Sequence, residues 1–227
     1  PDGSVTPDIL KSELNEIGYD CLIPRILNAA DYGVPQRRNR VIFIGYRKGM
    51  TPPKYPEATT KETEYLTLKD AIGDLIVNEN LRNKINIMLS DYQKDSINGR
   101  TPRINGLPIK SEKIYNCELS NQSEVVKERF SLFREGETGF ALRKRILDEG
   151  INLTGKKALL SLCSEKFNLD EKKVIKLFIN KEMTNEQLDV LLTKKNIRQR
   201  WSGDLPSATI VTIPDDYISP WEDRTFS

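Results

Sequence analysis

The chain has 227 residues, with 35 Lys and Arg against 33 Asp and Glu, no histidine, and a formal net charge of +2. This near-neutral balance does not by itself indicate a nucleic-acid partner. The lack of histidine excludes a Ser-His-Asp triad and removes the commonest general base. The three cysteines, Cys21, Cys117 and Cys163, lie far apart and form no Cys-x-x-Cys pair, so we predict no metal site.

A sparse, odd set of cysteines is typical of a reducing cytosol, so we expect a cytoplasmic protein. No apolar run approaches the length that spans a bilayer, and residues 1–4 are unlike the start of a signal peptide. We therefore expect no membrane partner. The first residue is proline rather than methionine, which suggests a piece excised from a longer protein.

The first element is predicted to be a helix that begins at Thr6 and ends at Gly18. Thr6 is a good N-cap residue, Pro7 suits the first helical position, and glycine favours a helix end. An apolar strand, Tyr19–Ile23, follows it. The helix should bury one apolar face, made by Ile9, Leu10, Leu14 and Ile17.

Residues 28–45 are the most informative stretch of the chain. The second half, Val41–Ile44, is apolar and rich in β-branched residues, which predicts a buried strand. The first half holds three turn formers, Asp31, Gly33 and Pro35.

One amide and two guanidiniums, spaced two residues apart, lie between that turn and that strand. In extended backbone, residues with this spacing point to one face. Planar guanidinium donors beside an amide suit a phosphate backbone and an adjacent base edge. The three residues are Gln36, Arg38 and Arg40.

The later part of the chain is predicted to be mostly helical. Residues 51–56 read as a stiff linker and a domain boundary, and Thr67 and Asp70 form a capping pattern before a short helix. We expect loop with some helix near 81–92, a helix at 122–133, and further helices through 138–200.

The charges are unevenly distributed along the sequence. Residues 24–54 hold seven Lys and Arg against Asp31 alone, and residues 151–200 hold eleven against six Asp and Glu. The last part, residues 201–227, has one arginine against five acidic residues. Basic patches beside an acidic end suit a protein that turns one face to a polyanion. For residues 151–200, a scaffold with solvated lysines fits the pattern equally well.

The run Asp31–Gly45 resembles the Gln-x-Arg-x-Arg block of the cytosine-C5 DNA methyltransferases. Further segments resemble that family in the same order: Thr67–Leu75, Ser123–Phe130, Arg198–Ile210, Tyr217–Pro220 and Arg224–Ser227. Two features depart from it. No histidine precedes residue 123, and Ser219 stands where the family usually has histidine.

The resemblance implies an α/β fold: the C-terminal edge of a Rossmann-like methyltransferase sheet plus a mixed, mostly helical target-recognition domain. We expect residues 1–52 to end the catalytic domain, 53–215 to form the target-recognition domain with a helical insert at 138–200, and 216–227 to return to the catalytic domain.

The family pattern also implies roles for individual residues. Arg40 would donate to the O2 edge of a flipped cytosine, Arg38 would hold the phosphate beside it, and Gln36 would support the loop or the gap in the duplex. We expect Trp201 to be a core residue. The DNA-binding candidates are Arg37, Arg198, Arg200, Ser202 and Thr209.

Methylation of cytosine C5 needs a flipped base, a cysteine thiolate that adds to C6, and a methyl sulfonium donor. The family supplies these with a Pro-Cys loop, a Glu-Asn-Val acid and a Gly-rich loop for S-adenosylmethionine, and none of these motifs occurs here. We therefore expect the chain to be inactive alone and to bind double-stranded DNA. We also expect it to self-associate through a severed sheet edge.

Two alternatives remain open at this point. One is a non-catalytic, sequence-specific DNA-binding subunit, and the other is an RNA cytosine-C5 methyltransferase. The long helical insert at 138–200 favours DNA over RNA, because the RNA enzymes of this kind have compact recognition regions.

Overall fold

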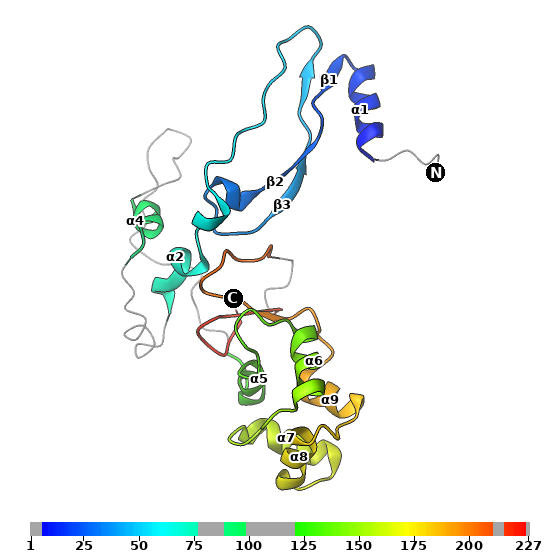
Figure 1. The fold of residues 1–227 in the computed structure, drawn as a ribbon, viewed down its shortest axis with the longest axis vertical. Helices are drawn as coiled ribbons and strands as arrows, with labels where there is room; N and C mark the ends of the chain where they lie inside the picture. The colour runs from blue at the N-terminus through cyan, green and yellow to red at the C-terminus, as the bar shows by residue number, and fades with distance from the viewer. Residues whose placement is uncertain (1–5, 77–88, 99–120, 211–215, 226–227) are drawn as a thin grey trace.

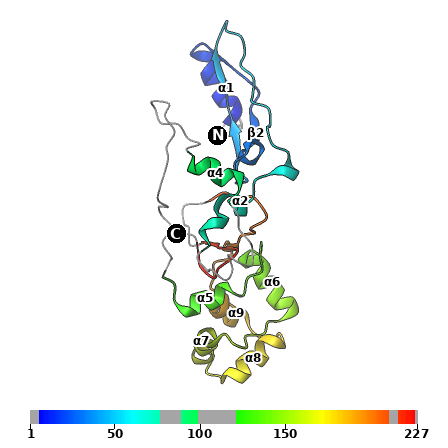
Figure 2. The same cartoon turned by 90° about the vertical axis from the view of Figure 1, so that its left-hand side faces the viewer.

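The computed structural model describes residues 6–76, 89–98, 121–210 and 216–225. They form an elongated molecule with an N-terminal lobe (residues 6–61) at one end and a helical unit (residues 121–192) at the other (Figure 1, Figure 2). The described residues combine α-helices with three two-stranded sheets, so the predicted mixture of helix and strand is confirmed. The Rossmann-like sheet edge stays a prediction.

The N-terminal lobe is one helix followed by two antiparallel strand pairs. β1 pairs with β4, and β2 pairs with β3 in the register that sets Arg25 opposite Ile42. The helix predicted from Thr6 is confirmed, and Leu14 on it lies close to Gly45. The elements are α1 (Thr6–Glu16), β1 (Tyr19–Cys21), β2 (Arg25–Asn28), the 3-10 helix η1 (Ala29–Tyr32), β3 (Asn39–Ile42) and β4 (Gly45–Arg47).

The prediction of a buried strand at Val41–Ile44 is wrong. β3 ends at Ile42, the next strand begins at Gly45, and the Val41 side chain is 52% exposed. The predicted apolar face of α1 is also largely exposed. The paired residues Ile26 and Val41 are 70% and 52% exposed, because a two-stranded pair is too narrow to bury both faces and the described residues leave this one uncovered. The predicted self-association would cover them and stays a prediction.

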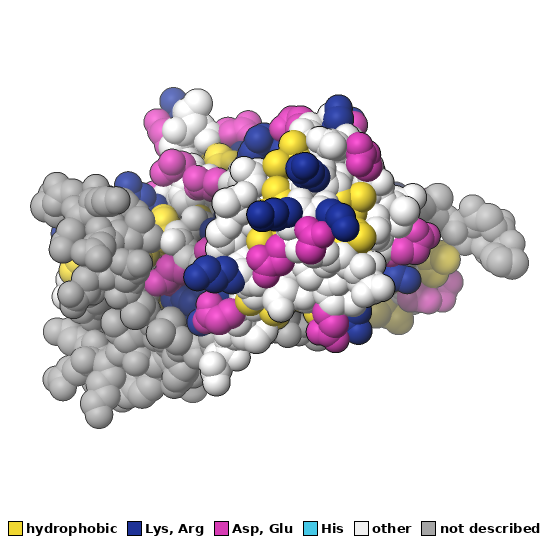
Figure 3. Space-filling view, turned by 90° about the horizontal axis from the view of Figure 1, so that it is seen from below, with side chains coloured by type: hydrophobic (Ala, Val, Ile, Leu, Met, Phe, Trp, Pro, Cys, Tyr) yellow, Lys and Arg dark blue, Asp and Glu magenta, His cyan; other side chains and the backbone are white. Residues whose placement is uncertain are grey.

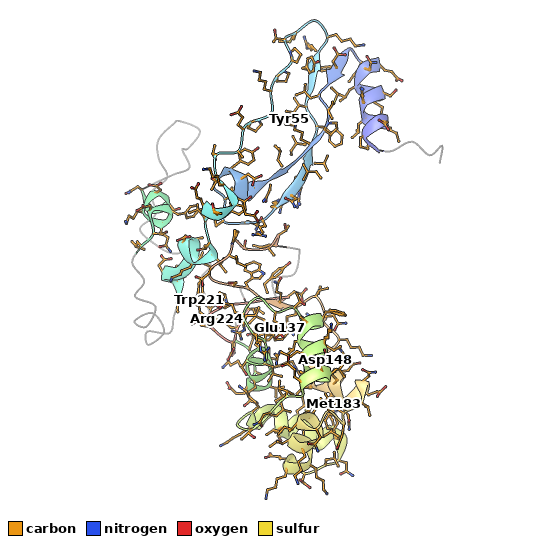
Figure 4. All side chains as sticks on the ribbon, viewed as in Figure 1. Tyr55, Glu137, Asp148, Met183, Trp221 and Arg224 are labelled. Atoms are coloured by element: carbon orange, nitrogen blue, oxygen red, sulfur yellow. The ribbon has the colours of Figure 1, made fainter. Side chains whose placement is uncertain are left out.

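Residues 51–61 lie back along the N-terminal lobe (Figure 1). The Tyr55 hydroxyl donates to the Ile42 carbonyl oxygen at 2.8 Å, and Figure 4 shows the ring beside the strand pair. Farther along, the Thr59 and Thr60 amides both donate to the Asp31 carbonyl oxygen, at 2.9 and 3.0 Å. The segment expected to be a linker, 51–56, is therefore packed against the lobe through hydrogen bonds. The domain boundary at residue 52 stays a prediction.

The segments between the lobe and the helical unit are η2 (Glu62–Glu64), α2 (Leu68–Ile72), η3 (Gly73–Leu75) and α4 (Asp91–Ile97). The capping pattern predicted at Thr67 is confirmed, because its hydroxyl accepts from the Asp70 amide while the Asp70 carboxylate accepts from the Thr67 amide. The helix expected near 81–92 falls mostly outside the described residues, and α4 begins only at Asp91.

The helical unit contains α5 (Glu124–Phe130), α6 (Gly139–Glu149), α7 (Lys157–Phe167), α8 (Glu171–Ile179) and α9 (Asn185–Leu192). These bear out the helices predicted within 122–133 and 138–200. The unit has its own apolar core, with Leu142 of α6, Leu159 of α7 and Phe178 of α8 fully buried. Most of this core comes from one stretch of sequence, residues 130–192.

Two short parallel strands close the helical unit: β5 (Gln199–Arg200) and β6 (Tyr217–Ile218). Ile218 is fully buried in the same core as the helices. The two strands thus form one structural unit across the boundary predicted at residues 215 and 216, which itself stays a prediction.

We predict that Gly150→Ala destabilises the helical unit more than Gly155→Ala, which serves as its matched control. Both glycines have positive φ, 74° and 86°, but only at Gly150 would a Cβ meet backbone oxygens, at 2.6 Å from Ile179 and 2.8 Å from Phe178. Strain and overpacking together should lower the free energy of unfolding by roughly 3 kcal/mol. The control should lose about 1 kcal/mol through its left-handed backbone alone. Urea denaturation measures both, and equal losses would contradict the packing described at Gly150.

Candidate nucleic-acid interface

The loop at residues 28–38 is closed at its base by one side chain. The Asn28 Oδ1 atom accepts from the Arg38 amide at 3.0 Å and from the Ala30 amide at 3.4 Å. The Ala29 amide donates back to the Arg38 carbonyl oxygen at 3.0 Å. Gly33 ends η1 with a φ of 75°, in the left-handed region that favours glycine. The turn predicted from Gly33 is therefore confirmed, and Asn28 fixes where Arg38 emerges.

The structure places Gln36, Arg38 and Arg40 in different surroundings. Gln36 is half-buried, and its backbone forms an isolated parallel β-bridge with Ser207, whereas Arg38 and Arg40 are exposed. Of the three, only Arg40 lies within β3, while Gln36 forms an isolated bridge and Arg38 lies between the two. The Arg40 Nη1 atom donates to the Asn39 carbonyl oxygen at 2.7 Å. Both arginines keep guanidinium surface in contact with solvent.

Backbone hydrogen bonds join this loop to a segment far away in sequence. The Arg37 amide donates to the Ser207 carbonyl oxygen at 2.8 Å, and the Ser207 amide donates to the Pro35 carbonyl oxygen at 3.0 Å. The Thr209 hydroxyl donates to the Arg37 carbonyl oxygen at 2.9 Å across 172 sequence positions. Residues 202–209, here called the junction segment, therefore lie directly against the Gln-x-Arg-x-Arg loop.

The junction segment is also held from its other side. The Leu68 and Lys69 amides at the start of α2 donate to the Leu205 and Gly203 carbonyl oxygens, both at 2.9 Å. The Glu135 Oε1 atom accepts from the Ser202 hydroxyl at 3.0 Å and from the Gly203 amide at 2.7 Å. The segment thus has bonded neighbours in the N-terminal lobe, in α2 and in the loop after α5.

A cleft of about 280 Å³ opens beside the junction segment. Three predicted DNA-binding residues, Arg37, Ser202 and Thr209, line it together. The Arg37 guanidinium pairs with Glu62 at 3.3 Å, and both side chains are more than half exposed, so this pair is weak. The other lining residues are Gly136, Gln199, Trp201, Leu205, Pro206 and Ala208.

The other two DNA-binding candidates face inward. Arg198 is 9% exposed, with its guanidinium 5.0 Å from the centroid of the Phe130 ring. Arg200 is 7% exposed and donates to the Ser219 and Phe130 carbonyl oxygens at 3.1 and 2.9 Å, in addition to an ion pair with Asp223. Both side chains belong to the interior in this structure, where they contribute to packing, and their expected contact with bases stays a prediction.

Strand geometry relates these two arginines to the residue between them. Successive residues of an extended strand point to opposite faces, so two inward arginines leave the residue between them facing outward. That residue is Gln199, which lines the cleft. No local signal in the sequence points to Gln199, because taking Trp201 as core would place Gln199, two residues earlier, on the same inward face. Trp201 is indeed buried, with its ring 4.7 Å from that of Tyr217.

An ion pair fixes the loop that carries Gly136. The Arg145 Nε and Nη2 atoms donate to the Glu137 Oε1 and Oε2 atoms at 2.7 and 2.9 Å. Burial alone would raise the pKa of the Glu137 carboxyl, but hydrogen bonds from Arg145 and from the Arg134 amide outweigh it and lower the pKa. Figure 4 shows Glu137 between α5 and α6. This wall of the cleft is therefore preorganised.

Lysines of the helical unit do not form one basic patch. Figure 3 shows the end of the molecule made by this unit, where Lys and Arg side chains alternate with Asp and Glu. Among the described residues, no helix is long and apolar enough to cross a membrane. The described part of the chain also holds no group of three His, Cys, Asp or Glu side chains placed for a metal ion.

The family model for C-5 cytosine-specific DNA methylase matches residues 2–224 of this chain. With the loop, the junction segment and the cleft described, the chain is plainly a member of that family.

Several relatives are Type II methyltransferases. M.XorII of Xanthomonas oryzae is 54% identical over 59 residues, which cover 26% of this chain and 13% of that protein. M.DdeI of Desulfomicrobium norvegicum is 45% identical over 80 residues, which cover 32% of this chain and 18% of that protein. M.FnuDI of Fusobacterium nucleatum is 46% identical over 72 residues, which cover 30% and 20%. The matched segments thus span at most a fifth of these relatives, and no solved structure matches the chain significantly.

Proposed function

We propose that this chain is the DNA-reading part of a cytosine-C5 DNA methyltransferase that works in a Type II restriction–modification system. The whole enzyme would methylate C5 of a flipped cytosine within a specific duplex site. The observation that carries the proposal is the union of the Gln-x-Arg-x-Arg loop with the junction segment, which joins two family segments into one cleft. We place the enzyme in the cytoplasm, in keeping with its few cysteines.

Each exposed polar residue near the cleft has a proposed role. Arg38, which is exposed and fixed at its backbone by Asn28, holds a phosphate beside the flipped nucleotide. Arg40 donates to the O2 edge of the flipped cytosine, and Gln36 supports the loop from its bridge to Ser207. Arg37 exchanges its exposed Glu62 partner for a second phosphate. Ser202 and Thr209 present hydroxyls at the rim of the cleft.

S-adenosylmethionine would supply the methyl group in the whole enzyme. The described residues of this chain do not fit that cofactor, because no Gly-rich turn links a strand to a helix and the cleft lining carries no carboxylate for ribose hydroxyls. We therefore assign the cofactor and the nucleophilic cysteine to parts of the enzyme other than these residues, and we expect this chain alone to be inactive.

The test of DNA binding is the salt dependence of affinity for a duplex, measured by fluorescence anisotropy. We predict that Arg38→Ala weakens binding to all sequences alike and reduces the slope of log K against log salt by about 1, since one phosphate contact is lost. Lys176→Ala, which changes an exposed lysine of α8, is the control and should leave the slope unaltered. No duplex binding at low salt, or equal binding of single-stranded RNA, would contradict the proposal.

The role of Arg40 is tested in a full-length methyltransferase that contains this chain. We predict that Arg40→Ala lowers kcat by about a hundredfold while duplex affinity changes little, because the lost donor acts on the flipped base. Arg40→Lys restores part of the activity by keeping the charge. Unchanged turnover in Arg40→Ala would remove this residue from the site.

A further inference from the structure

The segment from Ile197 to Arg200 divides its side chains between two faces. Arg198 and Arg200 are buried, whereas Ile197 is 71% exposed and Gln199 is half-buried at the cleft. Gln199 lies in β5 between the two buried arginines, whereas Ile197 lies in the turn that precedes the strand, closed by the Arg198 amide donating to the Lys195 carbonyl oxygen at 3.3 Å.

A second large apolar side chain lies beside Ile197. Thr138 and Gln199 form an isolated antiparallel bridge, and the two residues after Thr138, Gly139 and Phe140, lie against the turn that carries Ile197. The Gly139 and Phe140 amides donate to the Arg198 and Asn196 carbonyl oxygens at 2.6 and 3.1 Å. Phe140, the second residue of α6, is 67% exposed, whereas Leu142 and Ile146 of the same helix are fully buried.

The close fit at Gly139 shows that this arrangement is fixed. A Cβ at this position would lie 2.8 Å from the Lys195 carbonyl oxygen and 3.0 Å from that of Asn196, so only glycine lets the loop lie over the start of α6. The fit holds Phe140 and Ile197 at the surface, next to the cleft that Gln199 and Gly136 line. We call Phe140, Ile197 and Gln199 the outward strip.

The surroundings of the outward strip favour a nucleic acid over a protein partner. Lys144 and Lys194 are exposed on α6 and on the loop before Ile197, so cations flank the two apolar side chains. The Gln199 Nε2 atom donates to the Gly136 carbonyl oxygen at 3.4 Å, which is long for a hydrogen bond and is readily exchanged for a base edge. An amide and apolar groups within one strip match an A·T pair in the major groove, where adenine offers N6 and N7 and thymine a methyl group.

We propose that the outward strip reads an A·T base pair within the recognition site of this methyltransferase. Gln199 pairs with the N6 and N7 edge of adenine, and Ile197 with Phe140 covers the thymine methyl group. This inference rests on the proposed function, since it names the base pair that the same cleft selects. No covalent step is involved.

The experiment is selection from a randomised duplex library with this chain, compared among the wild type, Gln199→Ala and Gln199→Glu. The wild type should enrich a site with at least one fixed A·T position. Gln199→Ala should lower the preference at that position by about ten- to a hundredfold and leave the other positions unchanged. Gln199→Glu, which accepts but does not donate, should move the preference toward cytosine. Asn180→Ala, which removes an exposed amide at the end of α8, is the matched control.

The apolar part of the strip is tested on the selected site without relying on a glutamine variant. Replacing thymine by deoxyuridine removes only the methyl group and should weaken wild-type binding several-fold. Ile197→Ala should no longer distinguish the two duplexes. Sedimentation of Ile197→Ala and the wild type shows whether the strip instead joins two copies of the chain, which would overturn the proposal.

The outcomes separate this inference from the proposed function. No duplex binding at low salt would overturn both. Duplex binding without enrichment, or enrichment that neither Gln199 variant alters, would overturn the role of the outward strip and leave DNA binding in place. Unchanged thermal unfolding of the Gln199 variants shows that a lost preference is not a loss of fold.

Discussion

The architecture depends on the hydrogen bonds that hold the junction segment, residues 202–209. Its backbone is bonded to the loop at Arg37, to the start of α2, and to the Glu135 carboxylate. These partners come from three distant parts of the sequence, so the segment fixes the N-terminal lobe relative to the helical unit (Figure 1). Buried or half-buried backbone groups need partners, and each of these bonds supplies one. Losing the segment would separate the loop from the cleft.

The arginines of this region divide into two physical groups. Arg200 is buried and Arg145 is half-buried, and the contacts that the structure records for both are internal. Arg200 donates to the Phe130 carbonyl oxygen and pairs with Asp223, and Arg145 pairs with the Glu137 carboxylate. Breaking such a buried pair is costly, because the remaining charge is left without compensation. Arg38 and Arg40 instead stay at the surface, where a phosphate or a base edge can replace water. The chain thus uses one residue type both for rigidity and for the interface that we propose.

Local signals in the sequence predict much of the fold. The capping box predicted at Thr67 is confirmed, because it depends on residues within one turn of the helix. The turn at Gly33 follows in the same way from its backbone preference. The family resemblance, confirmed by a match over residues 2–224, rests on such short segments.

The sequence does not predict burial or side-chain orientation where these depend on residues far away in the chain. Val41 looks like a core residue, but no described layer covers its strand pair, so it stays half exposed. Arg198 and Arg200 look like base-reading residues, but their inward orientation is set by Phe130 and Ser219, far away in sequence. Nothing local in the sequence records which face of that strand meets the core, and so Gln199 was missed among the site residues.

We expect duplex DNA to lie against the loop and the junction segment rather than against the helical unit. Hydrogen–deuterium exchange of this chain, with and without an excess of duplex, would show where the DNA lies. We predict slower exchange of amides in residues 36–40 and 197–209, with α7 and α8 unchanged. Protection confined to α7 and α8, with none in the loop and the junction segment, would contradict it.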